Sequence, residues 1–268
     1  MSRSGGEAPR LVVEVKERCA RVTLDRPDKL NALDTQAYRE LEAAAAELGA
    51  RDDVAVVVLT GAGRAFCAGA DLEGFARDVD VADAHAVRAY LRWVGSVVKA
   101  WATLEKPTIA AVNGLAIGGG CNLALMCDLV LMREDASIAE VYAQRGLVPD
   151  MGGTYFLPRL VGRARAFELA YFGDALTAEE AVAAGLANRA VPAAEWDATI
   201  AAWARRLVET PGRALGLIKA GLLASPLLDL DAMLEWEANA IALAFATDDV
   251  RESLAAFRER RPPAYTGR

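Results

Sequence analysis

Two β-branched apolar runs, each followed by a glycine-rich loop, constrain the fold of this chain more than any other feature. Residues 54–60 (VAVVVLT) and 108–112 (TIAAV) are each typical of a strand covered on both faces. The loops GAGRAFCAGADL and NGLAIGGGCN follow them, and beyond the second loop a helix over 123–127 and a further strand over 128–132 are expected. This order predicts an α/β fold with a mostly parallel core and right-handed crossovers, whose working loops lie at the carboxyl ends of the strands.

The first fifty residues predict a hairpin that leads into a helix. Residues 11–16 (LVVEVK) and 20–25 (ARVTLD) are short β-rich runs separated by a charged turn. Apolar residues then recur at helical spacing, with Asp34 placed to cap the helix and Gly49 placed to end it.

The pattern after Val191 is helical only. Successive helices are expected near residues 193–208, 212–223, 229–246 and 248–259. We therefore expect a short disordered lead over 1–10, an α/β core over 11–192 and a helical C-terminal region over 193–268. Such a region can close an active site, build an oligomer interface, or do both.

Composition excludes several classes of protein. The chain has 268 residues, 54% of them apolar and 25% charged, which is unlike a disordered, collagenous or disulfide-stapled protein. Thirty Lys and Arg residues against thirty-seven Asp and Glu residues give a net charge of -7. Because no basic block is present, we expect no nucleic-acid partner.

Nothing in the sequence directs the chain to a membrane or to export. The start, MSRSGGEAPR, lacks the apolar region of a signal peptide. The uncharged stretch between Lys106 and Asp128 is long enough for a membrane span, but it contains Pro107, Asn113 and Asn122. Four cysteines without a CxxC pair are typical of buried free thiols, so a reducing cytoplasm is the expected location.

His85 is the only histidine, which disfavours zinc clusters and most hydrolase triads. We expect no metal site. The glycine loops offer a different chemistry. Gly69 can turn the chain so that the N–H of Ala70 points into a cavity, and Gly118-Gly119-Gly120 precede a helix whose free N–H groups carry partial positive charge. Two such donors could stabilise an oxyanion, although both loops could also be simple tight turns.

A nucleotide site does not fit these glycines. No Lys-Ser or Lys-Thr follows them as in a P-loop, and neither loop has the G-x-G-x-x-G spacing with an acid about twenty residues further on.

Five blocks of sequence, in order along the chain, resemble the crotonase (enoyl-CoA hydratase/isomerase) superfamily. They are RPDKLNALD (26–34), GRAFCAGADL (63–72), KPTIAAVNGLAIGGGCNLALMCDLVL (106–131), GLVPDMGGTYFLPRLVG (146–162) and AAFRERRPPAY (255–265). The resemblance implies a spiral of β-β-α units and a helical trimerisation region, and hence a homotrimer or dimer of trimers. It also implies an acyl-CoA thioester as substrate, with coenzyme A part of the substrate and no separate cofactor.

The resemblance assigns roles to particular residues. The oxyanion hole falls on the backbone N–H groups of Ala70 and Gly119. The segments that contact coenzyme A map to Lys29, Leu30, Ala32, Ala68, Asp71 and Leu72. Relatives use the region of His85 to line the acyl pocket, although an exposed helical histidine is also compatible. Cys67 and Cys121 flank the two donors and are expected to fill space. Three arginines near the C-terminus could reach the phosphates of coenzyme A or form a charged face: Arg258, Arg260 and Arg261.

The acid positions favour isomerisation over hydration. Hydratases of the superfamily carry two glutamates, and this chain has Asn122 and Tyr142 in those places. Asn and Tyr are poor substitutes for the base and acid that add water to a double bond. Asp150 lies where isomerases carry a catalytic aspartate, so the chain most resembles the 1,2-epoxyphenylacetyl-CoA isomerase and enoyl-CoA isomerase branch.

Several alternatives stay open at this level. Asp150 is either the base or only the cap of a helix beginning near Gly152. Asn122 could hold Asp150 or a water by hydrogen bonding, or it could only line the cavity. Tyr142 is expected to be a substrate-binding residue. Glu140 would restore a hydratase acid if the register slipped by two residues.

The predicted function is an acyl-CoA isomerase of fatty acid metabolism that shifts a double bond through a stabilised thioester enolate. The alternatives are an enoyl-CoA hydratase, which is a lyase, and an acyl-CoA-binding pseudoenzyme.

Overall fold

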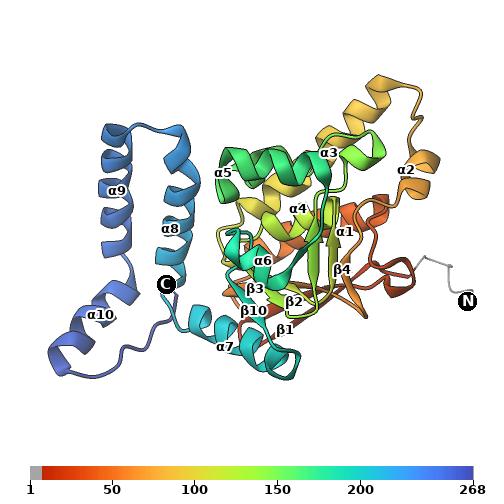
Figure 1. Ribbon diagram of the computed structural model, residues 1–268. Helices are drawn as coiled ribbons and strands as arrows, with labels where there is room; N and C mark the ends of the chain where they lie inside the picture. The colour runs from red at the N-terminus through yellow and green to blue at the C-terminus, as the bar shows by residue number, and fades with distance from the viewer. Residues whose placement is uncertain (1–7, 268) are drawn as a thin grey trace, which may run out of the picture.

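The computed structural model, which describes residues 8–267, contains two β-sheets covered by helices (Figure 1). The larger sheet has the order β1 (Leu11–Lys16), β2 (Cys19–Leu24), β3 (Val56–Gly61), β5 (Thr108–Val112), β7 (Leu129–Arg133) and β10 (Arg189–Val191). The smaller sheet has the order β4 (Ala65–Cys67), β6 (Leu115–Ile117), β8 (Ser137–Ala139) and β9 (Leu176–Thr177).

From β3 to β8, consecutive strands alternate between the two sheets. β3, β5 and β7 join the larger sheet, and β4, β6 and β8, which follow them, join the smaller one. Pairing is parallel throughout except in the β1–β2 hairpin and between β8 and β9. The predicted α/β class and the spiral of β-β-α units are confirmed.

The predicted hairpin and buried strands are present, with small shifts of their ends. Five strands were missed. β4 and β6 have only three residues each and lie inside the glycine loops, and β8, β9 and β10 are equally short, with two or three residues. The helix expected over 123–127 is α4 (Gly119–Leu125), which begins four residues earlier. The glycines are therefore the first turn of this helix, and only Gly118 precedes it.

Helix α1 (Thr35–Ala50) begins as predicted, because Asp34 Oδ1 accepts from Ala37 N at 2.8 Å. The prediction that Gly49 ends it was wrong, since Gly49 lies inside the helix. The C-terminal carbonyls are instead satisfied by the Lys106 ammonium, which donates to Leu48 O at 2.6 Å and also to Arg51 O. The Lys106 ammonium therefore caps the C-terminus of α1 in place of a glycine.

Helices cover the sheets. Between β4 and β5 lie α2 (Leu72–Asp78) and α3 (Ala84–Ala102), and α3 packs on α1 through a hydrogen bond from Trp101 Nε1 to Leu41 O of 2.9 Å. Between β8 and β10 lie α5 (Gly153–Phe172) and α6 (Ala178–Ala183). Short 3-10 turns occupy Pro27–Lys29, Ala143–Arg145, Ala193–Glu195 and Ser225–Leu227.

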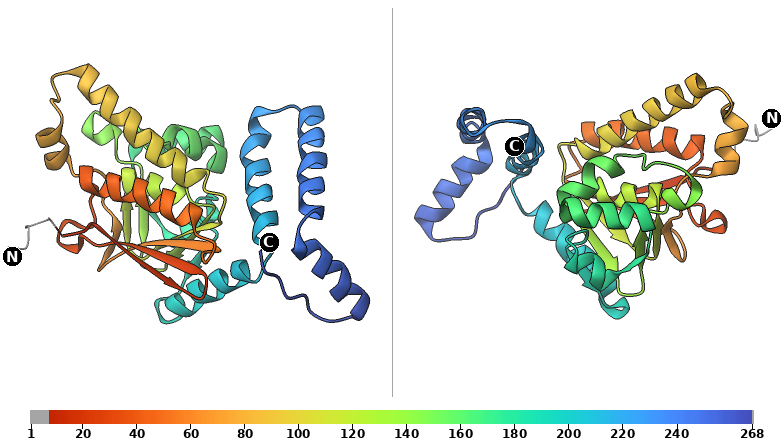
Figure 2. Two further views of the ribbon diagram at one scale, coloured as in Figure 1. Left: turned by 180° about the vertical axis from the view of Figure 1, so that it is seen from behind. Right: turned by 45° about the horizontal axis from the view of Figure 1, so that its top comes forward.

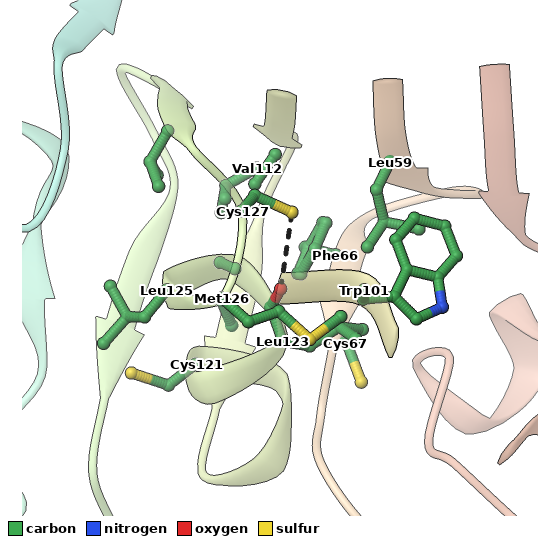
Figure 3. Close-up of a cluster of buried hydrophobic side chains, with 14 of the residues drawn as sticks. Leu59, Phe66, Cys67, Trp101, Val112, Cys121, Leu123, Leu125, Met126 and Cys127 are labelled. Atoms are coloured by element: carbon green, nitrogen blue, oxygen red, sulfur yellow. Dashed lines mark hydrogen bonds between the residues drawn. The ribbon is translucent and has the colours of Figure 1, made fainter. Parts of the chain in front are cut away.

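Every residue of α4 is buried, and its side chains fill the centre of the core (Figure 3). Cys67, Cys121 and Cys127 lie in this cluster as free thiols, with Cys127 Sγ 3.7 Å from Leu123 O. Burial raises the pKa of Cys67 and of Cys127 to about 12, so these thiols stay protonated and unreactive. They fill space in the core, as predicted.

The C-terminal region consists of four helices. α7 (Trp196–Val208) packs its apolar side on the outer face of the larger sheet, against Val58, Ile109 and Leu131. α8 (Gly212–Ala224) and α9 (Leu230–Phe245) form an antiparallel pair that stands away from the sheets, followed by α10 (Asp248–Glu259) (Figures 1 and 2). Lys219 ties α8 to the core through an ion pair with Asp128 of 2.9 Å.

Most of the predicted disordered lead, residues 1–7, lies outside the described residues. Across residues 8–267, none of the helices combines the length and the apolar character that crossing a bilayer would need.

Candidate active site

A pocket of about 340 Å³ lies where the loops after β4 and β6 meet the segment between β8 and α5. The loop after β4 contributes residues 68–71, the loop after β6 contributes Gly118, and α4 contributes Gly119. Tyr142 and Asp150 complete the opposite wall. The pocket therefore forms at the carboxyl ends of parallel strands, where such folds place their ligands.

The backbone N–H groups of Ala70 and Gly119 lie close together in this pocket. A methyl group built on Gly119 would lie 3.7 Å from Ala70 N, and one built on Gly69 would lie 3.2 Å from Gly119 N. Neither N–H has an acceptor within residues 8–267. Gly119 is the first residue of α4, so its N–H has no partner inside the helix.

The loop around Ala70 is fixed by its neighbours. Leu33 N donates to Gly69 O at 2.8 Å, and Asp71 N donates to Leu33 O at 2.9 Å. Because these two bonds face Leu33, the N–H of Ala70 between them points the other way, into the pocket. Gly69 has φ +90°, and a side chain there would come within 2.7 Å of Ile117 O, so the turn requires glycine. Two unpaired donors aimed at one place are the geometry of an oxyanion hole.

Asp150 is held by a tyrosine and an asparagine. The Tyr142 hydroxyl donates to Asp150 Oδ1 at 2.5 Å. Asn122 Nδ2 donates to Tyr142 OH at 3.2 Å and to the main-chain oxygen of Asp150 at 3.0 Å. Burial raises the pKa of the Asp150 carboxyl, while the hydrogen bond from Tyr142 opposes that rise. The result is a carboxylate that is more basic than an ordinary aspartate.

The alternative that Asp150 only caps a helix does not fit the structure. The N-cap of α5 is Gly152, and no side chain caps this helix. Gly153 N donates to the main-chain oxygen of Asp150 at 2.9 Å, so the carboxyl group is not used for that purpose. Its hydrogen bond goes to Tyr142, and the side chain lines the pocket.

Asn122 does not line the pocket but lies fully buried behind it, where it holds Tyr142 and the backbone at Asp150. Glu140 is also behind the pocket wall, with 3% of its surface exposed. The Cys121 thiol donates to Glu140 Oε1 at 3.5 Å. Tyr142, and not Glu140, lines the pocket and makes the hydrogen bond to Asp150.

The residues predicted to bind coenzyme A lie mostly at this pocket. Those that line it are Lys29, Ala32, Ala68, Asp71 and Leu72. Leu30 does not line it; its carbonyl accepts from Ala68 N at 3.0 Å and so supports the loop. The Asp71 carboxyl caps α2 through Gly74 N and pairs with Arg26 at 2.8 Å, so its side chain positions the loop.

Several lining residues were not predicted. They are Glu73, Ile117, Val141, Arg145 and Leu147. Arg145 and Leu147 adjoin or belong to the GLVPD segment, and this could have pointed to them. The aliphatic side chains of Ile117 and Val141 carry no chemical signal in the sequence.

The other sequence candidates lie elsewhere. His85 is exposed in the first turn of α3, outside the lining of this pocket. Arg261 pairs with Glu252 and with Glu259 at 2.7 Å, and Arg258 and Arg260 are exposed and do not line the pocket of this chain. In the part of the chain that the structure describes, no three His, Cys, Asp or Glu side chains are grouped to hold a metal ion.

Comparisons with known proteins point to one family. A family model described as enoyl-CoA hydratase/isomerase matches residues 14–268. A Rhodobacter capsulatus protein named "Probable enoyl-CoA hydratase" is 39% identical over 257 residues, covering 95% of this chain and 97% of that protein. The 1,2-epoxyphenylacetyl-CoA isomerase of Escherichia coli K12 is 35% identical over 258 residues, covering 96% and 98%.

The fold comparison gives the same family. The crystal structure of an enoyl-CoA hydratase from Bacillus anthracis superposes with a TM-score of 0.90 at 32% identity, covering 97% of this chain and 100% of that one. Both the family model and the structural superposition extend over nearly the whole chain. This chain belongs to the enoyl-CoA hydratase/isomerase family.

Proposed function

We propose that this enzyme is an acyl-CoA isomerase that moves a double bond along an acyl-CoA thioester. The observation that carries the proposal is the position of Asp150, whose carboxyl group shares one pocket with the N–H groups of Ala70 and Gly119. By the resemblance, the two positions where the hydratases carry glutamates hold Asn122 and Tyr142. Neither is a carboxylic acid, and both side chains donate hydrogen bonds to Asp150.

One base is enough for this reaction. The thioester oxygen would lie between the N–H groups of Ala70 and Gly119. Asp150 takes a proton from the carbon next to the thioester carbonyl, and the electron pair of that C–H bond forms the enolate that the two N–H groups stabilise. The protonated carboxyl group of Asp150 then returns the proton to the far carbon of the conjugated enolate. The double bond has moved, and the enzyme has regained its starting state.

The pocket makes Asp150 suitable for this work. Burial raises the pKa of its carboxyl, and a base whose pKa lies nearer to neutrality removes a weakly acidic proton more effectively. The hydrogen bond from Tyr142 keeps the group ionised and aimed. Coenzyme A is part of the substrate, and we propose that Lys29 and Arg145, the two cations of the lining, attract its phosphates.

Hydration is the second candidate, favoured by the name of the Rhodobacter capsulatus relative. It requires a second acid or base that can reach a water in the pocket. Glu140 is buried behind the wall and does not line the pocket, which makes it a poor candidate for that group.

The experiment that tests the proposal follows short-chain 3-enoyl-CoA and 2-enoyl-CoA thioesters by mass spectrometry in heavy water. We expect the wild type to convert the 3-enoyl thioester and to incorporate deuterium without the added mass of water. Asp150→Asn should lose at least about a thousandfold in rate, since removal of an essential base is costly. Asp135→Asn, an exposed aspartate outside the pocket, is the matched control and should leave the rate unchanged.

Isomerase turnover that survives in Asp150→Asn would contradict the proposal. A gain of one water on the 2-enoyl thioester would establish the hydratase instead. Tight thioester binding with neither turnover nor deuterium exchange would identify a pseudoenzyme.

We also propose that the chain acts as a homotrimer, or as a dimer of trimers, in the cytoplasm and in fatty acid metabolism. Large apolar side chains are exposed along the α8–α9 pair, including Leu222, Leu234, Ile241 and Phe245. Covering such side chains with a second copy of the chain would remove them from water.

A further inference from the structure

One arginine side chain joins the two segments that form the loop of Ala70. The Nη1 atom of Arg26 donates to Ala32 O at 3.0 Å, and its Nη2 atom donates to Asp71 Oδ2 at 2.8 Å. Ala32 directly precedes Leu33, and Asp71 directly follows Ala70. Leu33 and Ala70 pair with each other as an isolated parallel bridge. The guanidinium therefore holds both sides of the bridge that fixes the backbone at Ala70.

The same guanidinium connects the caps of two helices. Asp34 Oδ1 accepts from Ala37 N at the start of α1, and Asp71 Oδ1 accepts from Gly74 N at the start of α2. The second oxygen of each carboxylate faces Arg26, at 3.4 Å from Nη1 and 2.8 Å from Nη2. The N-termini of α1 and α2 are thus joined through one side chain, and the oxyanion loop runs directly into α2.

The two carboxylates differ in what they would lose without Arg26. Asp34 Oδ2 also accepts from Arg10 Nε at 2.8 Å, so a cation would remain beside it. Within residues 8–267, Asp71 Oδ2 receives a hydrogen bond from Arg26 alone. The Asp71 side chain is only 12% exposed, and a charge so far from water is costly once its partner is gone. Asp71 would then turn toward solvent and carry the backbone at Ala70 with it.

We propose that Arg26 is a positioning residue of the oxyanion hole, which holds Ala32 and Asp71 so that the N–H of Ala70 stays aimed at the thioester oxygen. The inference rests on the proposed role of Ala70 as an oxyanion donor. Arg26 does not line the pocket and acts through the loop. A guanidinium suits this position, because its planar fork donates to a backbone oxygen and a carboxylate at once, whereas lysine offers a single nitrogen.

The test measures the thioester carbonyl directly. Butyryl-CoA labelled with carbon-13 at the thioester carbonyl has no double bond to move, so its infrared spectrum can be recorded on the enzyme without isomerisation. Hydrogen bonds to a carbonyl oxygen weaken the C=O bond and lower its stretching frequency. We expect the frequency on the wild type to be lower than in free butyryl-CoA, because two N–H groups donate to the oxygen.

Arg26→Met removes the guanidinium and keeps most of the volume of the side chain. The donor at Gly119 remains, so the variant should lose about half of the frequency shift. The kcat for a short-chain 3-enoyl-CoA should fall about tenfold, with a smaller change in KM. Arg26→Lys should lie between Arg26→Met and the wild type, because one nitrogen replaces two.

Arg133→Met is the matched control. Arg133 also pairs with an aspartate, through Nη2 and Asp135 Oδ2 at 3.0 Å, and it lies outside the pocket lining. This variant should leave both the carbonyl frequency and kcat unchanged.

A folded Arg26→Met variant with the carbonyl shift and kcat of the wild type would overturn the inference, even if its Tm were lower, since Arg26 would then only stabilise the fold. If Arg26→Met does not fold, Arg26→Lys decides: a partial loss of the shift supports the inference, and a full shift overturns it. A wild type without any shift would defeat the oxyanion hole, and this inference with it. A wild type that shows the shift but moves no double bond would defeat only the isomerase proposal.

Discussion

At the scale of single residues, the site depends on how one tyrosine modulates one carboxylate. Burial raises the pKa of Asp150 and the hydrogen bond from Tyr142 lowers it, so the basicity of Asp150 reflects a balance between the two. The Tyr142 hydroxyl does not supply a proton itself, because burial and the nearby Asp150 charge raise its pKa well above its usual range. The Tyr142 hydroxyl instead orients the Asp150 carboxyl and favours its ionised form.

Among residues 8–267, Tyr142 is the one side chain that donates a hydrogen bond to the Asp150 carboxyl, and Tyr142→Phe removes that bond. The pKa of Asp150 should therefore rise. Because Asp150 must be ionised to act as the base, the acidic limb of the kcat/KM profile should move to higher pH, with about a tenfold loss below the limb and partial recovery above it. Rates measured across the profile check this shift.

Tyr155→Phe is the matched control, since Tyr155 lies on α5 outside the pocket and stacks with Arg159. It should leave the limb in place. A limb that moves to lower pH in Tyr142→Phe would show that the hydroxyl does not stabilise the ionised carboxylate.

At the scale of elements, the position of Gly119 depends on how closely α4 approaches β4. A side chain at Gly120 would lie 2.0 Å from Cys67 O, which is backbone and cannot move aside cheaply. The helix is therefore able to start beside Ala70 only because Gly120 has no side chain. The oxyanion hole is a consequence of helix–strand packing.

Gly120→Ala should force α4 away from β4 and cost on the order of 3 kcal/mol of unfolding free energy, as overpacking a rigid core does. Thermal or urea unfolding measures this loss. Gly95→Ala is the matched control, because no atom lies within 4 Å of the added carbon and the residue is inside α3. That variant should gain about 0.5–1 kcal/mol, since alanine is the better helix former. Equal effects of the two substitutions would contradict this account of α4.

At the scale of the whole molecule, the α8–α9 pair stands away from the core and exposes large apolar side chains (Figure 2). The Lys219–Asp128 ion pair fixes α8 to the core, yet Leu222 on the same helix keeps 69% of its surface exposed. Covering such a surface removes apolar side chains from water, and we propose that another copy of the chain covers it.

Leu222→Glu should weaken this association, because each copy would bury an unpaired charge at the contact. We expect sedimentation velocity to show the wild type as a trimer or a hexamer and the variant shifted toward the monomer. Val81→Glu is the matched control, since Val81 is 58% exposed and lies before α3, away from the α8–α9 pair. A monomeric wild type, or a variant with unchanged sedimentation, would contradict the proposed assembly.

The sequence by itself determined the features that depend on local patterns. The buried strands are visible because both faces are covered, the cap at Asp34 because its side chain satisfies a helix terminus, and the helical tail because apolar residues recur at helical spacing. Most of the pocket lining was also predicted, although those residues came from the resemblance to the crotonase superfamily and not from a local pattern. Gly49 was misjudged because the cap of α1 comes from Lys106, far away in the sequence.

Only the tertiary structure decided which of these features meet. Parallel pairing of β4 with β6 brings Ala70 beside Gly119, and packing of the segment before α5 on α4 brings Asp150 to Tyr142 and Asn122. Asn122 Oδ1 and Glu140 Oε2 are buried without a partner among the described residues, and this could not be predicted at all, because a missing hydrogen bond depends on every neighbour at once. Local patterns specify elements, whereas contacts between distant residues depend on strand register and helix packing.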